Sequence, residues 1–327
     1  MEIIGNKRTK NQLDIAVGAA EKRNAAIPHI MFSGAPGCGK TSLARFLAQK
    51  TGFPFLSIVP ESIKDYKSTL SLFDRLDHSG YDERGNRVGK INPTILFLDE
   101  VHNLPIKGQE LLGLAMERFI IESTEPNMYF WIPQFTVVGA TTLAGNLSKP
   151  FLDRFKMTFS FQPYDMDDME EIVKYHSDRM KVRITPRAIT EIAKRSRGTP
   201  RVAVRFIERV KDKMSHIGSS FATTTLVKGT FKDLGVDGEG FTTLELRILK
   251  SLLDASKPVS LDNLSTILQE DAKSIKGYAE PYLIRQGMLL VSGKGRIITE
   301  KGAQYLNKSG EAGRLVKEKI PFDYNRK

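Results

Sequence analysis

Eight consecutive residues, 34–41, read Gly-Ala-Pro-Gly-Cys-Gly-Lys-Thr and match the pattern G-x-x-x-x-G-K-[ST]. Glycines in such a loop leave room for backbone N–H groups to point at phosphate oxygens, and the positive end of the next helix adds to the attraction. We expect the Lys40 ammonium to hold the β- and γ-phosphates and the Thr41 hydroxyl to bind Mg²⁺. The sequence therefore predicts a site for a nucleoside triphosphate, whose loop residues are Gly34, Pro36, Gly37, Cys38, Gly39, Lys40, Thr41 and Ser42.

Two carboxylates, Asp99 and Glu100, follow the apolar run 95–98. A buried parallel strand that stops at two acids places them at its carboxyl end, where ligands bind in such sheets. We expect Asp99 to hold Mg²⁺ through water and Glu100 to orient and deprotonate an attacking water. An apolar run before two acids is common by itself, and its position downstream of the phosphate loop is what favours a catalytic role.

Three further positions are ambiguous from spacing alone. Thr142, or its neighbour Thr141, can reach a γ-phosphate from the end of a strand or can simply cap that strand. Arg154 can neutralise transition-state charge in a neighbouring subunit, although a surface salt bridge is the simpler interpretation. Arg201 begins a helix and can sense a bound nucleotide or lie free on the surface.

Composition limits the class of protein. A chain of 327 residues can form two or three domains, and its net charge of +11 favours phosphate-bearing partners. Residues 170–216 alone carry a net charge of +7, which indicates either a phosphate-binding surface or a solvated helical face. There is no apolar run of membrane-spanning length and no signal peptide. The single cysteine excludes an internal disulfide framework, so we expect a reducing, cytoplasmic setting.

The order of apolar runs predicts the architecture. Up to residue 164, β-rich runs alternate with amphipathic segments, which is typical of an α/β fold with a parallel sheet. Helical patterns follow over 165–238, then three helices and two strands over 239–307, which together predict a winged helix, and then a polar, basic tail over 308–327. Residues 77–92 are rich in glycine and charge and predict an exposed insertion. The expected core strands are 30–33, 55–59, 94–99, 136–140 and 157–161.

Taken together, these segments resemble the RuvB family, the hexameric AAA+ motors of Holliday-junction branch migration. The match keeps its order from about residue 3 to residue 306 and is carried by the runs 29–34, 98–102, 138–142, 153–155, 197–201 and 280–287. The resemblance implies an AAA+ ATPase core over 1–164, a helical lid and a C-terminal winged helix on DNA. It also implies ATP and Mg²⁺ as cofactors, a hexameric ring, and a role in DNA recombination and repair.

The resemblance carries over to single residues. Beside the loop and the two acids, it implies that Thr142 is a first sensor, that Arg154 is a finger offered to the next subunit, and that Arg201 is a sensor in the lid. It further implies that Tyr164 lines the nucleotide site and that the backbone at Ile3 and Ile4 packs on adenine. In the wing, Lys294 and Arg296 match positions that touch the DNA backbone.

The chain also departs from the family pattern. The segment between residues 119 and 135 is shorter than the family's hairpin, which docks the junction-binding protein RuvA, although its tip at 127–131 keeps apolar residues. Leu152 replaces one of two closely spaced arginines, Arg118 stands where an acid is usual, and 77–92 has no family counterpart.

Three functions compete at this level. The preferred one is an ATP-driven motor acting on Holliday junctions or other branched DNA. Duplex DNA should stimulate ATP hydrolysis by such a motor. An AAA+ loader or remodelling ATPase would instead need a protein partner and would not translocate processively. A nucleotide-gated regulator would read bases with the helix expected over 272–285, and its affinity would vary with DNA sequence.

Overall fold

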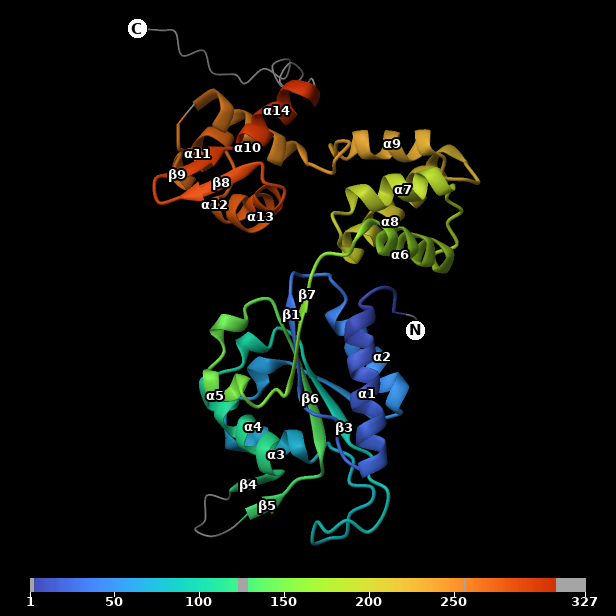
Figure 1. Ribbon diagram of the computed structural model, residues 1–327, viewed down its shortest axis with the longest axis vertical. Helices are drawn as coiled ribbons and strands as arrows, with labels where there is room; N and C mark the ends of the chain where they lie inside the picture. Colours follow the sequence, from blue (N-terminus) through green and yellow to red (C-terminus); the bar gives the residue numbers. More distant parts are fainter. Residues whose placement is uncertain (1–2, 123–128, 256, 310–327) are drawn as a thin grey trace. The chain divides into compact units, whose positions relative to one another are not determined.

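A computed structural model describes residues 3–122, 129–255 and 257–309 (Figure 1). The chain divides into two compact units, Met1–Lys211 and Asp212–Lys327. In the first unit a hydrophobic cluster lies on each face of a sheet, and the second unit has a cluster of its own. Among the described residues, no helix is both long and apolar enough to cross a membrane.

A five-stranded parallel sheet forms the centre of the first unit. Its strand order is β2-β3-β6-β1-β7, and every pairing is parallel. The neighbouring strands β3 and β6 are buried at every position, because helices cover both faces of the sheet. The predicted α/β class is confirmed, with strands β1 (Ile30–Gly34), β2 (Phe55–Ile58), β3 (Thr94–Leu98), β6 (Phe135–Thr141) and β7 (Met157–Phe161).

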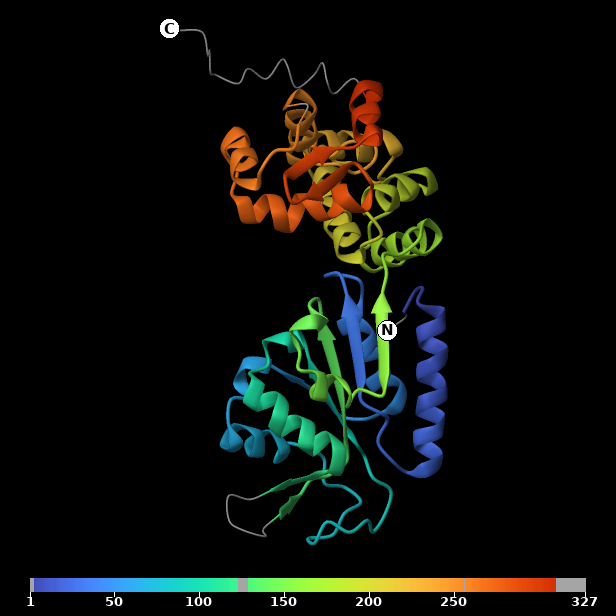
Figure 2. The ribbon, with the colours of Figure 1, turned by 60° about the vertical axis from the view of Figure 1, so that its left-hand side comes forward.

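Helices cover both faces of this sheet (Figure 2). On one face, α1 (Lys7–Arg23) and α2 (Lys40–Thr51) bury an apolar stripe against β1 and β3. On the other face, α3 (Tyr66–Phe73) and α4 (Ile106–Arg118) pack on β3 and β6. The short α5 (Lys149–Leu152) completes this layer, with the 3-10 turns η1 (Pro60–Ser62), η2 (Val101–Asn103) and η3 (Ala144–Asn146).

Three helices follow β7, as predicted. They are α6 (Met166–Arg179), α7 (Pro186–Arg195) and α8 (Pro200–Ile217). The N-cap of α6 is Asp165, whose side chain accepts a hydrogen bond from the N–H of Asp168. Proline in the first turn begins α7, where the fixed φ suits a helix and no N–H is lost from the ladder. Helix α6 packs against α7.

In the second unit, the three predicted helices, the two-stranded wing and a further C-terminal helix contribute to an apolar cluster. The helix expected over 272–285 is continuous but contains a π-helical turn, Ile275–Ala279, which ends two residues before Pro281. Proline cannot donate a hydrogen bond and displaces the preceding carbonyls, which explains the turn. A last helix, α14, was not predicted. The elements are α9 (Thr224–Asp233), α10 (Thr243–Ala255), α11 (Leu261–Leu268), α12 (Ala272–Ser274), η4 (Ile275–Ala279), α13 (Glu280–Arg285), β8 (Leu289–Ser292), β9 (Gly295–Ile298) and α14 (Glu300–Ser309).

Residues 77–92 and 119–134 form what we call the loop–hairpin region. The first segment precedes β3 and the second precedes β6, so both lie at the amino edge of the parallel sheet. The second contains the hairpin of β4 (Ile120–Glu122) and β5 (Tyr129–Trp131). Residues 123–128, which include part of the predicted apolar tip, lie outside the described residues, as do residues 310–327 of the predicted tail.

The loop 77–92 is not simply an exposed insertion, because it wraps around Trp131. The rings of His78 and Tyr81 lie 5.5 and 5.4 Å from that indole, measured between ring centroids. Gly85 lies so close that an added Cβ would sit 2.4 Å from the indole. The carboxylate of Asp82 accepts hydrogen bonds from the backbone N–H groups of residues 84 and 86, which shapes the turn. The loop and the hairpin therefore form one packed structure.

Candidate functional site

The phosphate loop joins the end of β1 to the start of α2, as predicted. Gly37 and Gly39 have φ values of +78° and +90°, in the left-handed region that side chains disfavour. At Gly34 an added Cβ would lie 2.5 Å from the carbonyl oxygen of Phe161 on β7. Glycine is therefore needed at these three positions to give the loop its shape. Cys38, by contrast, buries its side chain in the apolar cluster beneath the loop.

Lys40 folds back onto the loop that precedes it. Its Nζ donates to the carbonyl oxygens of Gly34 at 2.7 Å and Ala35 at 3.1 Å. Burial lowers the pKa of Lys40, while the nearby carboxylates of Glu100 and Asp99 act in the opposite direction. The ammonium thus lies beside the cradle of backbone N–H groups, where a phosphate would replace the two carbonyls as its partner.

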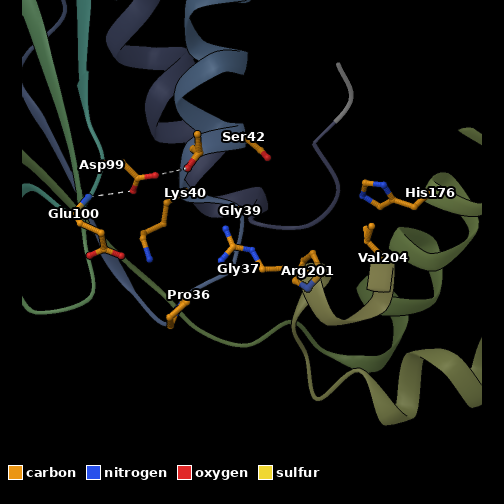
Figure 3. A pocket seen from close by; sticks show the side chains of 12 residues that line it. Pro36, Gly37, Gly39, Lys40, Ser42, Asp99, Glu100, His176, Arg201 and Val204 are labelled. Carbon is orange, nitrogen blue, oxygen red and sulfur yellow. Dashed lines mark hydrogen bonds between the residues drawn. The ribbon is translucent and has the colours of Figure 1, made fainter. Parts of the chain in front are cut away.

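Asp99 and Thr41 come together from two different elements. Thr41 is in the first turn of α2 and Asp99 follows β3; the hydroxyl donates to a carboxylate oxygen at 3.4 Å (Figure 3). A hydroxyl and a carboxylate are oxygen ligands of the kind that Mg²⁺ prefers, with water and substrate oxygens completing its shell. Among the described residues, no group of three or more His, Cys, Asp or Glu side chains is placed for a metal.

Glu100 has a left-handed backbone, with φ +48°, and takes part in a small polar network. One of its carboxylate oxygens accepts from the backbone N–H of Thr142 at 3.2 Å and from its hydroxyl at 3.1 Å. His102 Nδ1 lies 3.2 Å from the same oxygen and 2.9 Å from the hydroxyl of Thr141. The predicted acid and the predicted sensor are therefore direct neighbours. No role for His102 was predicted, although it lies in the run 98–102 that carries the family resemblance.

A cavity of about 260 Å³ separates these groups from two helices of the lid segment. Figure 3 shows Lys40, Asp99 and Glu100 on one side of it and Arg201, Val204 and His176 on the other. Arg201 packs against Gly37, where an added Cβ would lie 2.8 Å from that of the arginine. The predicted Arg201 therefore faces the phosphate loop. The loop also contributes Pro36, Gly37, Gly39, Thr41 and Ser42 to the lining.

A smaller cavity of about 80 Å³ adjoins the first and shares Gly39, Ser42, His176 and Pro200 with it. Ile3, Ile4 and Tyr164, which the resemblance assigns to the nucleotide site, line this smaller cavity. The Tyr164 hydroxyl accepts from the amide of Asn6 at 2.7 Å, and burial raises the pKa of Tyr164 to about 12.

The sequence did not indicate Tyr175 and His176 of α6, which also line this smaller cavity. Burial and the charge of Arg179 lower the pKa of His176. Because α6 is amphipathic and its surface pattern is unremarkable, only the tertiary structure identifies these two side chains as part of the site.

Arg154 lies at the other edge of the sheet from its own phosphate loop. It precedes β7, whose Met157 pairs with Ile30, whereas the loop begins at Gly34, which pairs with Phe161. Four residue steps along a strand correspond to roughly 13 Å. The Arg154 guanidinium also points to α4, where Nε donates to the carbonyl of Gly113 at 2.9 Å. Arg154 is therefore not part of the cavity formed by the other predicted residues.

In the wing, the two predicted DNA contacts have different surroundings. Lys294 is exposed in the turn between β8 and β9. Arg296 instead pairs with Glu280 of α13, with N–O distances of 2.6 and 3.2 Å. Because the Glu280 side chain is only 5% exposed, removal of Arg296 would leave a buried charge. Arg296 thus has a structural role that the basic pattern did not indicate.

Three family models match successive parts of the chain. Residues 30–163 match the ATPase family associated with various cellular activities (AAA), residues 164–237 match the RuvB AAA lid domain, and residues 238–307 match the RuvB C-terminal winged helix domain.

Curated relatives and solved structures agree with these models. The chain is 35% identical to the Holliday junction branch migration complex subunit RuvB of Lactobacillus helveticus over 308 residues, covering 92% of this chain and 85% of that protein. The Streptococcus uberis subunit is 34% identical, with 93% and 90% covered. A mutant of Thermotoga maritima RuvB has a TM-score of 0.77 at 32% identity, covering 94% of this chain and 96% of that one. The structure described as the Thermotoga maritima RuvB Holliday junction branch migration motor has a TM-score of 0.74 at 32% identity, with 93% and 95% covered.

Proposed function

Because the chain belongs to the RuvB family, we propose that it is an ATP-driven motor that migrates the branches of four-way DNA junctions as a ring of identical subunits. The observation that carries this proposal is the gathering of Lys40, Thr41, Asp99 and Glu100 around one cavity at the carboxyl edge of the sheet. A phosphate cradle with an adjacent acid is the arrangement that triphosphate hydrolysis requires.

The chemistry follows from these side chains. The loop N–H groups and Lys40 would hold the triphosphate, and Thr41 and Asp99 would hold the metal. When bound, Mg²⁺ offsets the negative charge on the β- and γ-phosphate oxygens. Glu100 accepts a proton from the attacking water, and the hydroxyl of Thr142, now 3.1 Å from that carboxylate, keeps the water in line. Tyr164 and the backbone at Ile3 and Ile4 receive the adenine.

The ring is proposed from the position of Arg154. An arginine that stabilises transition-state charge must reach the γ-phosphate, and Arg154 lies at the far edge of its own sheet. A neighbouring copy can present its arginine to this site, whereas the same copy cannot. We expect a hexamer, as the resemblance implies. Arg201, which lines the cavity, would then couple hydrolysis to movement of the helices that follow the core.

DNA binding is assigned to the C-terminal winged helix, residues 239–307, with the ATPase core at 1–164 and the lid at 165–238. Lys294 is exposed on the wing and suits a phosphate contact. We propose that Arg296, two residues further along the wing, contributes to the same DNA-contacting surface. Phosphate contacts carry no base sequence, which suits a motor that moves along any duplex. A RuvA-like protein on the β4–β5 hairpin and a cytoplasmic location complete the proposal.

Junction dissociation tests this function. Purified protein with ATP and Mg²⁺ should convert a synthetic four-way junction into two duplexes, and duplex DNA should stimulate hydrolysis. Lys40→Ala should abolish both, because the γ-phosphate loses its cation. An intact junction in the presence of steady ATP consumption would contradict the motor. Hydrolysis that depends on a protein partner and not on DNA would instead support the loader, which is the alternative.

A further inference from the structure

The guanidinium of Arg154 is held by three acceptors from two elements. Nε donates to the carbonyl of Gly113, one terminal nitrogen donates to the carbonyl of Pro150, and the other lies 3.3 Å from the carboxylate of Glu117. An arginine has five N–H groups, so two are left with no acceptor among the described residues. The side chain is fixed and yet retains donors for an outside anion.

Gly113 makes this arrangement possible. It lies inside α4 and is buried, although glycine is a poor helix former. An added Cβ would lie 3.1 Å from both Cδ and Nε of Arg154, closer than ordinary van der Waals contact. The absence of a side chain therefore lets the arginine lie across the helix and reach the Gly113 carbonyl. We call Gly113, Glu117 and Pro150 the Arg154 seat.

The surroundings of the seat suit an anion from another molecule. Arg154 lines a recess of about 540 Å³ together with Arg23 and Lys156. Two acids, Glu117 and Asp153, also line this recess, so cations outnumber acids there. This recess shares no lining residue with the nucleotide cavity of the same chain.

We propose that Gly113 and Glu117 are positioning residues that hold Arg154 ready for the γ-phosphate in the next copy of the chain. The inference rests on the proposed function, since it requires a ring in which Arg154 acts on a neighbour. Its physical basis is preorganisation: donors that are already oriented need no reordering as charge develops. The seat thus determines how well one subunit completes another subunit's site.

Rings assembled from two variant subunits test the Arg154 seat separately from ATP hydrolysis by the subunit that carries the seat. Arg154→Ala subunits keep their acids but offer no arginine, and Glu100→Gln subunits offer an arginine but cannot hydrolyse. A ring made of either variant alone should be inactive. A mixed ring should regain turnover wherever the intact nucleotide site of an Arg154→Ala subunit lies next to the intact Arg154 of a Glu100→Gln subunit. Adding Gly113→Ala to the Glu100→Gln subunit should lower the recovered kcat at least about fivefold, because small displacements of a catalytic group are costly. Adding Glu117→Gln instead should lower it about threefold.

The matched control is Gly18→Ala in the Glu100→Gln subunit. Gly18 also lies within a helix, and an added Cβ there meets nothing within 4 Å, so recovery should be complete. The thermal midpoint of Gly113→Ala should not fall, since alanine is the better helix former.

Three outcomes would decide the question. Equal recovery with Gly113→Ala and with Gly18→Ala would overturn the seat while leaving the proposed function intact. A rise in kcat with Glu117→Gln would also overturn it, because the ion pair would then restrain the arginine. Failure of the parent mixture to regain any turnover would refute the action of Arg154 on a neighbour, and the seat with it.

Discussion

The nucleotide site and the loop–hairpin region occupy opposite edges of one parallel sheet, and they are built in different ways. At the carboxyl edge, polar side chains surround open cavities, and the hydroxyl of Thr41 lies 3.4 Å from Asp99. In the loop–hairpin region at the amino edge, the rings of His78 and Tyr81 pack around Trp131. The nucleotide site is arranged to receive a ligand, whereas the loop–hairpin region is packed around one indole ring.

This difference separates turnover from stability. Groups that await a ligand contribute little to folding, because their partners in the free protein are weak or shared with water. Groups that are packed around an aromatic ring stabilise the fold through the apolar area that they bury and the fit of their shapes, but they touch no nucleotide. Substitutions in the nucleotide site and in the loop–hairpin region should therefore have opposite consequences.

The largest effect is expected for Glu100→Gln. Turnover should fall by roughly 10²- to 10⁴-fold, because the amide cannot accept the proton of water. The unfolding midpoint should stay close to that of the parent, since Glu100 is partly exposed. Steady-state hydrolysis and thermal unfolding check the two halves of this prediction. A strongly destabilised variant would show that the site also supports the fold.

Trp131→Ala should do the reverse. Loss of this half-buried indole removes the centre of the loop–hairpin packing and should lower the free energy of unfolding by about 2–3 kcal/mol. Turnover without a protein partner should remain within about twofold, because no nucleotide ligand is touched. Urea unfolding followed by circular dichroism measures the loss. Phe130→Ala, at a position 45% exposed, is the control and should have little effect; equal losses would contradict the packing.

His29 should give the amino edge a dependence on pH. Its Nε2 lies 2.9 Å from the Met116 carbonyl and its Nδ1 accepts from the Val137 N–H, so the ring is neutral; burial lowers its pKa to about 4. The unfolded chain binds a proton near pH 6.5, so stability is full above that pH and is lost as pH falls towards 4. The loss between pH 6.5 and 5 should be about 2 kcal/mol.

His29→Gln is the variant that isolates this histidine. Its unfolding free energy should fall less than that of the parent between pH 6.5 and pH 5, as urea titrations at both values would reveal. Parallel curves for the two proteins would assign the acid sensitivity to another group.

The smallest effect is expected for Gly85→Ala. Its φ of +79° strains any side chain, and the added Cβ would press on Trp131, for a total cost of about 2 kcal/mol. Gly52→Ala is matched, because Gly52 has φ +72° but meets nothing within 4 Å, and should cost about 1 kcal/mol. Denaturant midpoints measure the difference between the stability losses of the two variants, which we attribute to the contact with the indole. Identical costs would mean that the loop does not press on Trp131.

Much of the nucleotide site could be predicted from the sequence because its rules are local. The loop needs glycine where φ is positive, at Gly37 and Gly39, and the acids Asp99 and Glu100 end a strand that is apolar throughout. The order of strands and helices along the chain also predicted the α/β core and the winged helix. The roles of individual residues, such as Thr142 and Arg201, stay predictions that the geometry supports.

Other features could not be read in this way, because they depend on pairs that are distant in the chain. The family resemblance implied that Arg296 contacts the DNA backbone, whereas its pairing with Glu280 follows from the packing of the wing on α13. Likewise, the apparent insertion 77–92 has a hydrophilic composition, and only the hairpin folded beside it explains its shape.

The sequence by itself determined the chemistry that the carboxyl edge offers and the order of the elements that present it, since glycine conformation and strand burial are local properties. Tertiary structure alone decided which groups hold Arg154, since Gly113 and Glu117 are about forty residues away in the chain. Long-range packing brings such groups together, and local conformational preferences do not specify these contacts.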